Sequence, residues 1–249
     1  MFTLAACYAV LGFIAVILVR RNPAFVAVSA EMDETQLTVK EALGKCQFWV
    51  LCMMDFCTIF PLLYMASVFK IMGMQIGNYD DKFLTVVASV GSLANGLLRV
   101  FWGYAQDKTG FRRLYQIVLL IELLFCTLMP IIVRTNQYLY LFWVFIGYMC
   151  LGAHFVLFPN CIISIFGLRS SVQLSSFIYI SRCIPAISTI FISKALVPYF
   201  GEATYSIMFY SSSVLVIISS VLLAFVQEEK PIRKESSVKT DEDSYVRIN

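Results

Sequence analysis

The sequence predicts an all-α protein that crosses a membrane several times as a polytopic helical bundle. Of its 249 residues, 59% are hydrophobic and 14% are charged, whereas an ordinary soluble domain is about 45–50% apolar and about 25% charged. The apolar residues form seven runs that approach or reach the roughly 20 residues needed to cross a ~30 Å hydrocarbon core. The Lys and Arg residues then fall mainly on one side of the predicted membrane.

The seven runs form one leading span and a group of six. They lie at about 2–19, 47–69, 83–103, 114–133, 138–158, 175–197 and 204–226, and we expect the fifth helix to continue to about 166. The first run could also be the apolar part of a signal peptide, but Arg20 and Arg21 follow it and no basic segment precedes it, which favours a span. We therefore predict four regions: a first transmembrane helix at 1–19, a cytoplasmic connector at 20–46, a six-helix bundle at 47–227 and a disordered cytoplasmic tail at 228–249.

The basic residues give the orientation of these spans. If the connector is cytoplasmic, thirteen of the 19 Lys and Arg residues lie on the cytoplasmic side and three on the other side. The remaining three, Arg99, Arg182 and Lys194, lie within spans. This asymmetry agrees with seven spans, because one missed helix would exchange the two sides. Within the connector, Thr38 and Glu41 have the spacing of a capping box at the start of a short helix.

The composition also excludes several classes of function. A net charge of +3 is too small to indicate nucleic acid as a partner, and the 8 Cys residues lie almost entirely in apolar runs, where they act as small packing residues. With a single His and no Cys/His cluster, we expect neither a metal nor a cofactor. The sequence lacks the H-E-x-x-H and G-x-S-x-G motifs of an enzyme site. It also lacks the Asp-Arg-Tyr and Asn-Pro-x-x-Tyr elements expected of a receptor with seven spans.

The third run carries an arginine inside the predicted membrane. Ser92, Asn95 and Arg99 are three and four residues apart, so they share one face of a helix. An arginine in hydrocarbon costs about 2.5–3.5 kcal/mol on insertion scales and normally faces a cavity or a partner. Arg99 therefore either contacts a substrate, pairs with Asp55 or Glu122, or extends its side chain to the membrane surface.

A charged segment follows this run and leads to the fourth. We expect its first glycine to allow a close backbone approach and its aspartate to accept hydrogen bonds at the start of the next helix. As a bare loop it is an ordinary cytoplasmic connection. Its full spacing, however, resembles the loop motif of the major facilitator superfamily, G-x-x-x-D-[RK]-x-G-[RK]-[RK], with Phe111 displacing the basic pair by one position. The matching residues are Gly103, Asp107, Lys108, Gly110, Arg112 and Arg113.

The resemblance implies that the seven runs correspond to helices six to twelve of a twelve-helix transporter, over about residues 2–227. The chain then looks like the C-terminal half of a major facilitator fold, without the first five helices. Two functions remain open. The chain is either a carrier, or the half of one, that works by alternating access, or a truncated half that does not transport and acts only in an assembly with its missing N-terminal half or another chain.

The sixth run carries the second intramembrane arginine. Polar or small residues recur along it at spacings of three and four and form one stripe. This stripe either lines a cavity or is a packing seam, and Pro185 is expected to loosen the backbone beside it. The stripe consists of Ser175, Tyr179, Arg182, Ala186, Thr189 and Ser193.

Two inward-facing guanidinium groups on separate helices predict a site for carboxylates, because the guanidinium fork matches a carboxylate with two parallel hydrogen bonds. The segments around Asn95 and Arg99, around Phe158 and Pro159, and around Tyr179 and Arg182 are similar to the oxalate–formate antiporter branch. That resemblance implies that Arg99 and Arg182 hold the anion, Arg182 standing where the branch has Lys. The related monocarboxylate transporters have Asp where this chain has Asn95, so Arg99 is less neutralised here.

The substrate-binding candidates are therefore Arg99, Arg182, Asn95 and Tyr179. Asp55, in the second run, is a candidate coupling residue that could balance an arginine, take up a proton or form a buried polar pair. His154, in the fifth run, is a second coupling candidate or a packed, hydrogen-bonded histidine. Asp55 also bears on the substrate: if it neutralises an arginine, one positive charge remains and a monoanion fits better. The expected partners are a small mono- or dicarboxylate and the lipid bilayer of a membrane that the sequence does not specify.

Overall fold

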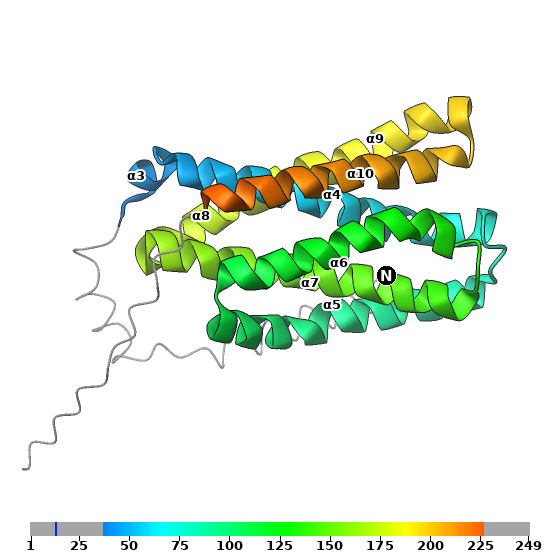
Figure 1. Ribbon diagram of the computed structural model, residues 1–249, viewed down its shortest axis with the longest axis horizontal. Helices are drawn as coiled ribbons and strands as arrows, with labels where there is room; N and C mark the ends of the chain where they lie inside the picture. Colours follow the sequence, from blue (N-terminus) through cyan, green and yellow to red (C-terminus); the bar gives the residue numbers. More distant parts are fainter. Residues whose placement is uncertain (1–12, 14–36, 227–249) are drawn as a thin grey trace, which may run out of the picture.

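Every regular element in the described part of the chain is helical. The computed structural model describes Phe13 and residues 37–226, and Figure 1 gives its labelled helices. The predicted first span, residues 20–36 of the connector and the tail lie outside the described residues. The elements are α3 (Val39–Leu43), α4 (Cys46–Gln75), α5 (Asp81–Thr109), α6 (Phe111–Ile132), α7 (Gln137–Phe166), α8 (Leu168–Ser181), α9 (Cys183–Phe200), α10 (Ala203–Leu222) and the short 3-10 helix η2 (Leu223–Phe225).

Six of the seven predicted spans fall in the described residues, and all six are confirmed as helical segments that are long and apolar enough to cross a membrane. They are α4, α5, α6, α7, the pair α8–α9 over Ser170–Phe200, and α10 with η2 over Ala203–Phe225. Several helices are longer than the apolar runs that predicted them. The polar ends of α5, for example, extend the run 83–103 to Asp81–Thr109, because a helix can continue into the membrane surface where charged residues are stable.

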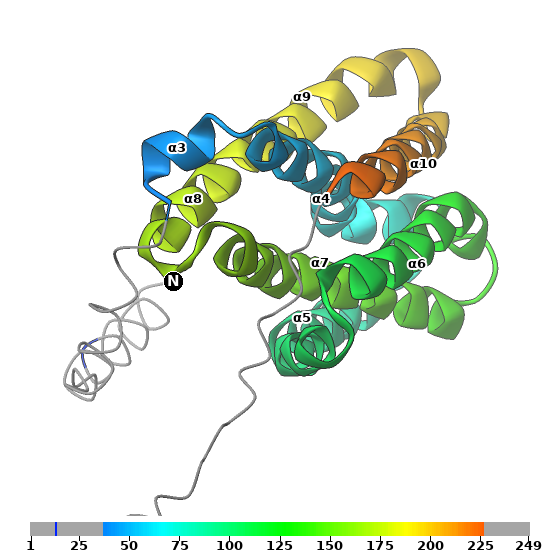
Figure 2. The same ribbon diagram turned by 60° about the vertical axis from the view of Figure 1, so that its left-hand side comes forward.

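The bundle is organised around α4. In Figure 2, α5, α6 and α7 lie together, while α4, α9 and α10 form the neighbouring group. The two groups meet where α4 packs against α7 and α10 packs against α6. The most apolar stretch of α4 is 67% buried, against 22% for α5 and 11% for α8–α9, so α4 is central and the other two are peripheral.

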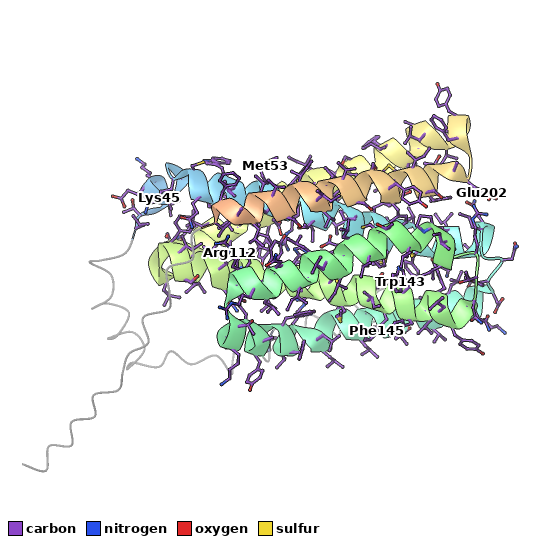
Figure 3. All side chains as sticks on the ribbon, viewed as in Figure 1. Lys45, Met53, Arg112, Trp143, Phe145 and Glu202 are labelled. Atoms are coloured by element: carbon purple, nitrogen blue, oxygen red, sulfur yellow. The ribbon has the colours of Figure 1, made fainter. Side chains whose placement is uncertain are left out.

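Basic residues gather at one end of the described bundle. Figure 3 places Lys45, at the start of α4, and Arg112, at the start of α6, at the same end of the molecule. Glu202, in the turn between α9 and α10, lies at the opposite end. The two ends agree with the sides that the sequence assigned to these residues. Near the first end, α3 has the expected capping box: the Thr38 hydroxyl accepts from the Glu41 N–H and the Glu41 carboxylate accepts from the Thr38 N–H.

The charged segment after the third span differs from its prediction. Residues 103–109 continue α5, and the turn is confined to Gly110, whose φ of 80° is a conformation that favours glycine. Asp107 is exposed in the last turn of α5, three residues before the turn at Gly110. A Cβ at Gly103 would meet only a methyl group of Val156 at 3.5 Å, so the expected close backbone approach does not occur there.

The backbones of α5 and α7 approach closely at other positions of this helix pair. A Cβ at Gly152 of α7 would lie 2.7 Å from the backbone oxygen of Asn95, and one at Gly91 of α5 would lie 2.3 Å from the Tyr148 ring. Gly96, in contrast, has no atom within 4 Å of its Cβ position. On α5, Gly91 therefore allows a close helix contact, whereas Gly96 lies at no such contact.

The sixth span is not one helix from 175 to 197, as the run suggested. It begins at Leu168 and is divided at Arg182 into α8 and α9. Pro185 has no N–H, so the carbonyl of Ser181 loses its partner in the helical ladder. The Arg182 carbonyl still accepts from Ala186. The expected loosening by Pro185 therefore takes the form of a discontinuity, and it lies at the arginine.

Candidate functional site

Arg182 forms a buried ion pair with Asp55. Its Nε donates to Oδ2 at 2.8 Å and its Nη2 donates to Oδ1 at 2.7 Å, the two parallel bonds of a guanidinium–carboxylate pair. Arg182 is 6% exposed and Asp55 is fully buried. Nη2 also donates to the backbone oxygen of His154, whereas Nη1 has no hydrogen-bond partner among the described residues. One edge of this guanidinium is thus paired with Asp55, while Nη1 is buried without a hydrogen-bond partner among the described residues.

Arg99 is held differently, by its own helix. Its Nε donates to the Asn95 backbone oxygen at 3.1 Å and its Nη2 to Asn95 Oδ1 at 3.2 Å. The side chain is partly buried, and within the described part of the chain no carboxylate forms an ion pair with it. Asn95 thus orients Arg99 without neutralising its charge.

The two arginines meet at one aromatic ring, that of Phe155. The Arg99 Cζ lies 4.6 Å and the Arg182 Cζ lies 4.7 Å from the Phe155 ring centroid. Two groups within that distance of one centroid are less than about 10 Å apart, and both are within cation–π range. Tyr179 lies 4.7 Å from the Arg182 Cζ and donates its hydroxyl to the Phe155 backbone oxygen.

A second polar group lies behind the ion pair, also fully buried. His154 Nε2 lies 3.3 Å from Glu122 Oε2, and His154 Nδ1 lies 3.9 Å from Asp55 Oδ1. The longer contact is not a hydrogen bond. The Tyr115 ring packs edge-on against the His154 ring, and its hydroxyl is hydrogen-bonded to the Thr58 hydroxyl at 2.9 Å.

The structure brings together all four predicted substrate-binding residues. Arg99 and Arg182 both lie against Phe155, Asn95 holds Arg99, and Tyr179 contacts Arg182. Of the partners left open by the sequence, Asp55 pairs with Arg182, while neither Asp55 nor Glu122 pairs with Arg99. The loop-motif residues lie at the end of α5 and the start of α6 and take no part in this constellation.

Sequence reasoning missed two members of the constellation. Phe155 is one of 21 Phe residues, and no sequence pattern distinguished it. Glu122 was considered only as a possible partner of Arg99, although its position inside an apolar run was itself a signal for a functional group. Among the described residues, no group of three His, Cys, Asp or Glu side chains could hold a metal ion.

The chain resembles known carriers in sequence. Over 204 residues it is 26% identical to the oxalate:formate antiporter of Oxalobacter formigenes. This match covers 81% of this chain and 48% of that protein. Over 179 residues it is 23% identical to the apicoplast pyruvate carrier 1 of Toxoplasma gondii, covering 68% of this chain and 33% of that protein. The chain thus spans half or less of the length of these relatives.

The family of this chain follows from the match to a whole-family model. The model described as Major Facilitator Superfamily matches residues 46–247. Together with the six apolar helices, this match confirms a multi-pass integral membrane protein, and the prediction that the chain is not an enzyme agrees with a family of transporters. With most of its length matched by that model, the chain belongs to the major facilitator superfamily.

Proposed function

We propose that the chain forms the anion-binding half of a secondary carrier for a small carboxylate, and that this half prefers a monocarboxylate. The charge count at Phe155 supports the preference. Arg99 and Arg182 contribute two positive charges and Asp55 contributes one negative charge, so one positive charge remains. One monoanion neutralises it, whereas a dianion leaves an excess negative charge in a medium where unpaired charge is costly.

The unused donors suggest where the carboxylate binds. Arg182 offers Nη1, which has no hydrogen-bond partner among the described residues, and Arg99 carries the charge that no described carboxylate balances. A carboxylate between these groups accepts charge-assisted hydrogen bonds from two helices, α5 and the α8–α9 junction. The rings of Phe155 and Tyr179 offer an apolar surface for the organic part of the substrate.

The discontinuity at Arg182 supports transport by alternating access. Transporter sites are typically built at broken helices, around which one part of the bundle moves against another. Here α8 packs mainly on α7, whereas α9 packs mainly on α4 and α10, so the two segments can follow different neighbours. The other face of the substrate then belongs to a missing N-terminal half or to another chain.

The single observation that carries this proposal is the convergence of two guanidinium groups on one ring, only one of which is paired with a described carboxylate. The first test is binding. The chain, purified in lipid nanodiscs, is titrated with formate, pyruvate, lactate and oxalate by calorimetry. At neutral pH we expect the three monoanions to bind more tightly than oxalate, because one monoanion neutralises the single positive charge that remains at the site.

Arginine variants test the two binding groups. Arg99→Gln and Arg182→Gln each remove a charge-assisted contact, and we expect a loss of about 2–5 kcal/mol in anion binding, roughly 30-fold or more. Lys194→Gln is the matched control, because Lys194 is another cation within a predicted span but is exposed on α9. If the Arg99→Gln protein folds and binds formate as tightly as the parent, the proposed site is wrong.

Uptake separates a carrier from a non-transporting half. The chain spans 48% of one relative and 33% of the other, so uptake by this chain alone and uptake that requires a second half are separate outcomes. Labelled formate uptake into liposomes that contain only this chain would make it a carrier by itself. Binding without uptake would make it the binding half of an assembly.

A further inference from the structure

The charge of Asp55 sets the net charge of the proposed anion site. This inference rests on the proposed function, in which Asp55 leaves one positive charge for the substrate. If Asp55 gained a proton, both guanidinium charges would be uncompensated and the same donors would match a dicarboxylate. What controls the proton on Asp55 therefore controls the charge of the anion.

A short chain of titratable groups leads to Asp55. The imidazole of His154 has one nitrogen facing each of two carboxylates: Nε2 is 3.3 Å from Glu122 Oε2 on α6, and Nδ1 is 3.9 Å from Asp55 Oδ1 on α4. All three side chains are fully buried. Within the described residues, His154 Nδ1 and Glu122 Oε1 have no hydrogen-bond partner. Buried polar atoms are rarely left without a partner, so these two are candidates for a function.

The 3.9 Å contact joins His154 Nδ1 and Asp55 Oδ1, and a small movement of either side chain would make it a hydrogen bond. It is too long for a hydrogen bond while Asp55 Oδ1 and Oδ2 both accept from Arg182. If an incoming carboxylate draws the Arg182 guanidinium away, Asp55 is left as a buried carboxylate with a weaker partner, which favours a proton on it. Arg182 lies nearer to Oδ1 but does not give up its proton, so the group that can pass a proton to Oδ1 is His154, through Nδ1.

Other ionisable groups also surround this chain. The charge of Glu122 acts on Tyr115, Cys126 and Cys150, and that of Asp55 acts on Tyr115, Tyr179 and Cys52. The positive charge of Arg182 interacts electrostatically with His154, and the charges of both arginines interact with Tyr179. The proposed relay does not use these phenols and thiols. The exchangeable proton is therefore assigned to the two carboxyl groups and the imidazole.

We propose that Glu122, His154 and Asp55 form a proton site that selects the charge of the transported anion: a monocarboxylate when Asp55 is ionised and a dicarboxylate when Asp55 is protonated. In this step the O–H bond of Glu122 breaks as Nε2–H forms on His154. Nδ1–H then breaks as O–H forms on Asp55, and Glu122 regains a proton from water. His154 ends in its other neutral tautomer, and the net change is one proton taken up from solution.

Proton counting tests the proposal on the unaltered protein. Binding of oxalate and of formate is measured by calorimetry in two buffers of different ionisation enthalpy, which gives the protons taken up with each anion. We expect about one proton per oxalate and about none per formate, so that oxalate affinity rises about tenfold for each unit of pH lowered between about pH 8 and pH 6. Equal proton counts for the two anions would overturn the proposal.

Asp55→Asn mimics the protonated carboxyl permanently. It is expected to bind oxalate without proton uptake, with an affinity that no longer depends on pH, and to favour oxalate over formate. Glu202→Gln is the matched acid-to-amide control at an exposed position and keeps the proton count of the parent. If Asp55→Asn does not fold, the proton count of the parent still decides.

Glu122→Gln separates the relay from a structural role. With a pH-indicating dye in stopped flow, we expect proton uptake after oxalate mixing to slow at least tenfold while the final count is unchanged. A merely structural role would change affinity and not this rate, and an unchanged rate would remove Glu122 from the proton site. The two proposals fail separately: if no carboxylate binds, the proposed function is wrong, whereas binding of both anions without a difference in protons overturns only the proton site.

Discussion

The two intramembrane arginines differ in how their charge is balanced. Arg182 lies at a helix discontinuity, is nearly buried and donates two parallel bonds to the carboxylate of Asp55, which comes from a distant part of the chain. Arg99 lies within the continuous helix α5, is only partly buried and bonds to Asn95 one turn away. Both arginines contact the Phe155 ring, but among the described residues only Arg182 is paired with a carboxylate.

This difference predicts a structural role for Arg182 and a ligand-binding role for Arg99. A buried ion pair is weak evidence for stability as such, yet removing one of its partners is strongly destabilising because the other is left unpaired. Arg182 is therefore committed to the fold as well as to the site. Arg99 leaves no described carboxylate unpaired when it is removed, so its charge is available to a ligand. The following predictions test that division, from the largest expected effect to the smallest.

Replacing Asp55 by Leu should destabilise the protein most. It leaves the Arg182 guanidinium buried without a carboxylate, at a cost of about 3–5 kcal/mol, which corresponds to a fall in Tm of roughly 10 °C for a domain of this size. Thermal unfolding in detergent, followed by size-exclusion chromatography, measures this. The double variant Asp55→Leu with Arg182→Met should recover most of the loss.

The same measurement on Arg99→Leu gives the contrast. Its Tm should change by about 2 °C or less, since it removes only bonds within one helix turn and one ring contact. Equal losses for Asp55→Leu and Arg99→Leu would remove the distinction between the two arginines.

Asn95→Asp should make Arg99 resemble Arg182. The new carboxylate would replace Oδ1, 3.2 Å from Arg99 Nη2, and would compensate the charge that the substrate is proposed to use. We expect anion affinity to fall by about 2 kcal/mol or more, roughly 30-fold, in calorimetric titrations with formate. Gln116→Glu adds the same charge at an exposed position of α6 and serves as the control. Unchanged formate affinity in Asn95→Asp would show that Arg99 does not bind the anion.

Phe155→Ala should affect both arginines together. Each loses a cation–π contact worth about 0.5–1 kcal/mol at an exposed site and about 2 kcal/mol when desolvated. Formate affinity should fall by about 1–2 kcal/mol, roughly 5- to 30-fold. Phe145→Ala, about 15 Å from Phe155 along the same helix α7, controls for the loss of a phenyl ring (Figure 3 labels Phe145). Equal effects of the two substitutions would contradict a shared platform.

Gly152→Ala tests the support behind Arg99. Its Cβ would lie 2.7 Å from the Asn95 backbone oxygen, the acceptor of Arg99 Nε, so α5 has to move away from α7. Overpacking of this kind costs about 1–3 kcal/mol. Gly96→Ala, with open space around its Cβ position, should be neutral or stabilising by up to about 1 kcal/mol. Unfolding by chemical denaturant distinguishes the two, and a neutral Gly152→Ala would show that this helix contact gives way easily.

The sequence predicted what depends on hydropathy and on local spacing. The six described spans, the capping box of Thr38 and Glu41 and the grouping of Arg99 with Asn95 all follow from neighbours in the chain. Pairings between distant helices did not follow. Asp55 and Arg182 are 127 residues apart, and the sequence could not decide between Arg182 and Arg99 as the partner of Asp55.

Three features were missed, each for its own physical reason. The polar residues of segment 103–113 predict a turn. A polar helix end beyond the membrane is as stable as a loop, however, and α5 continues to Thr109. Hydropathy predicts a single helix for the sixth span, because it does not detect the backbone hydrogen bond that Pro185 removes. Phe155 was not found because nothing in a single sequence ranks one phenylalanine above another.

The discontinuity at Arg182 has a consequence for voltage. A charge at the pivot of two arms travels the shortest distance when the arms swing, while charges at their tips travel far. Moving an elementary charge through the whole potential is worth about 2.3 kcal/mol per 100 mV. In the proposed transport cycle, a guanidinium between α8 and α9 would therefore reorient with little electrical work, and the sensitivity to membrane potential would come from the anion and the proton.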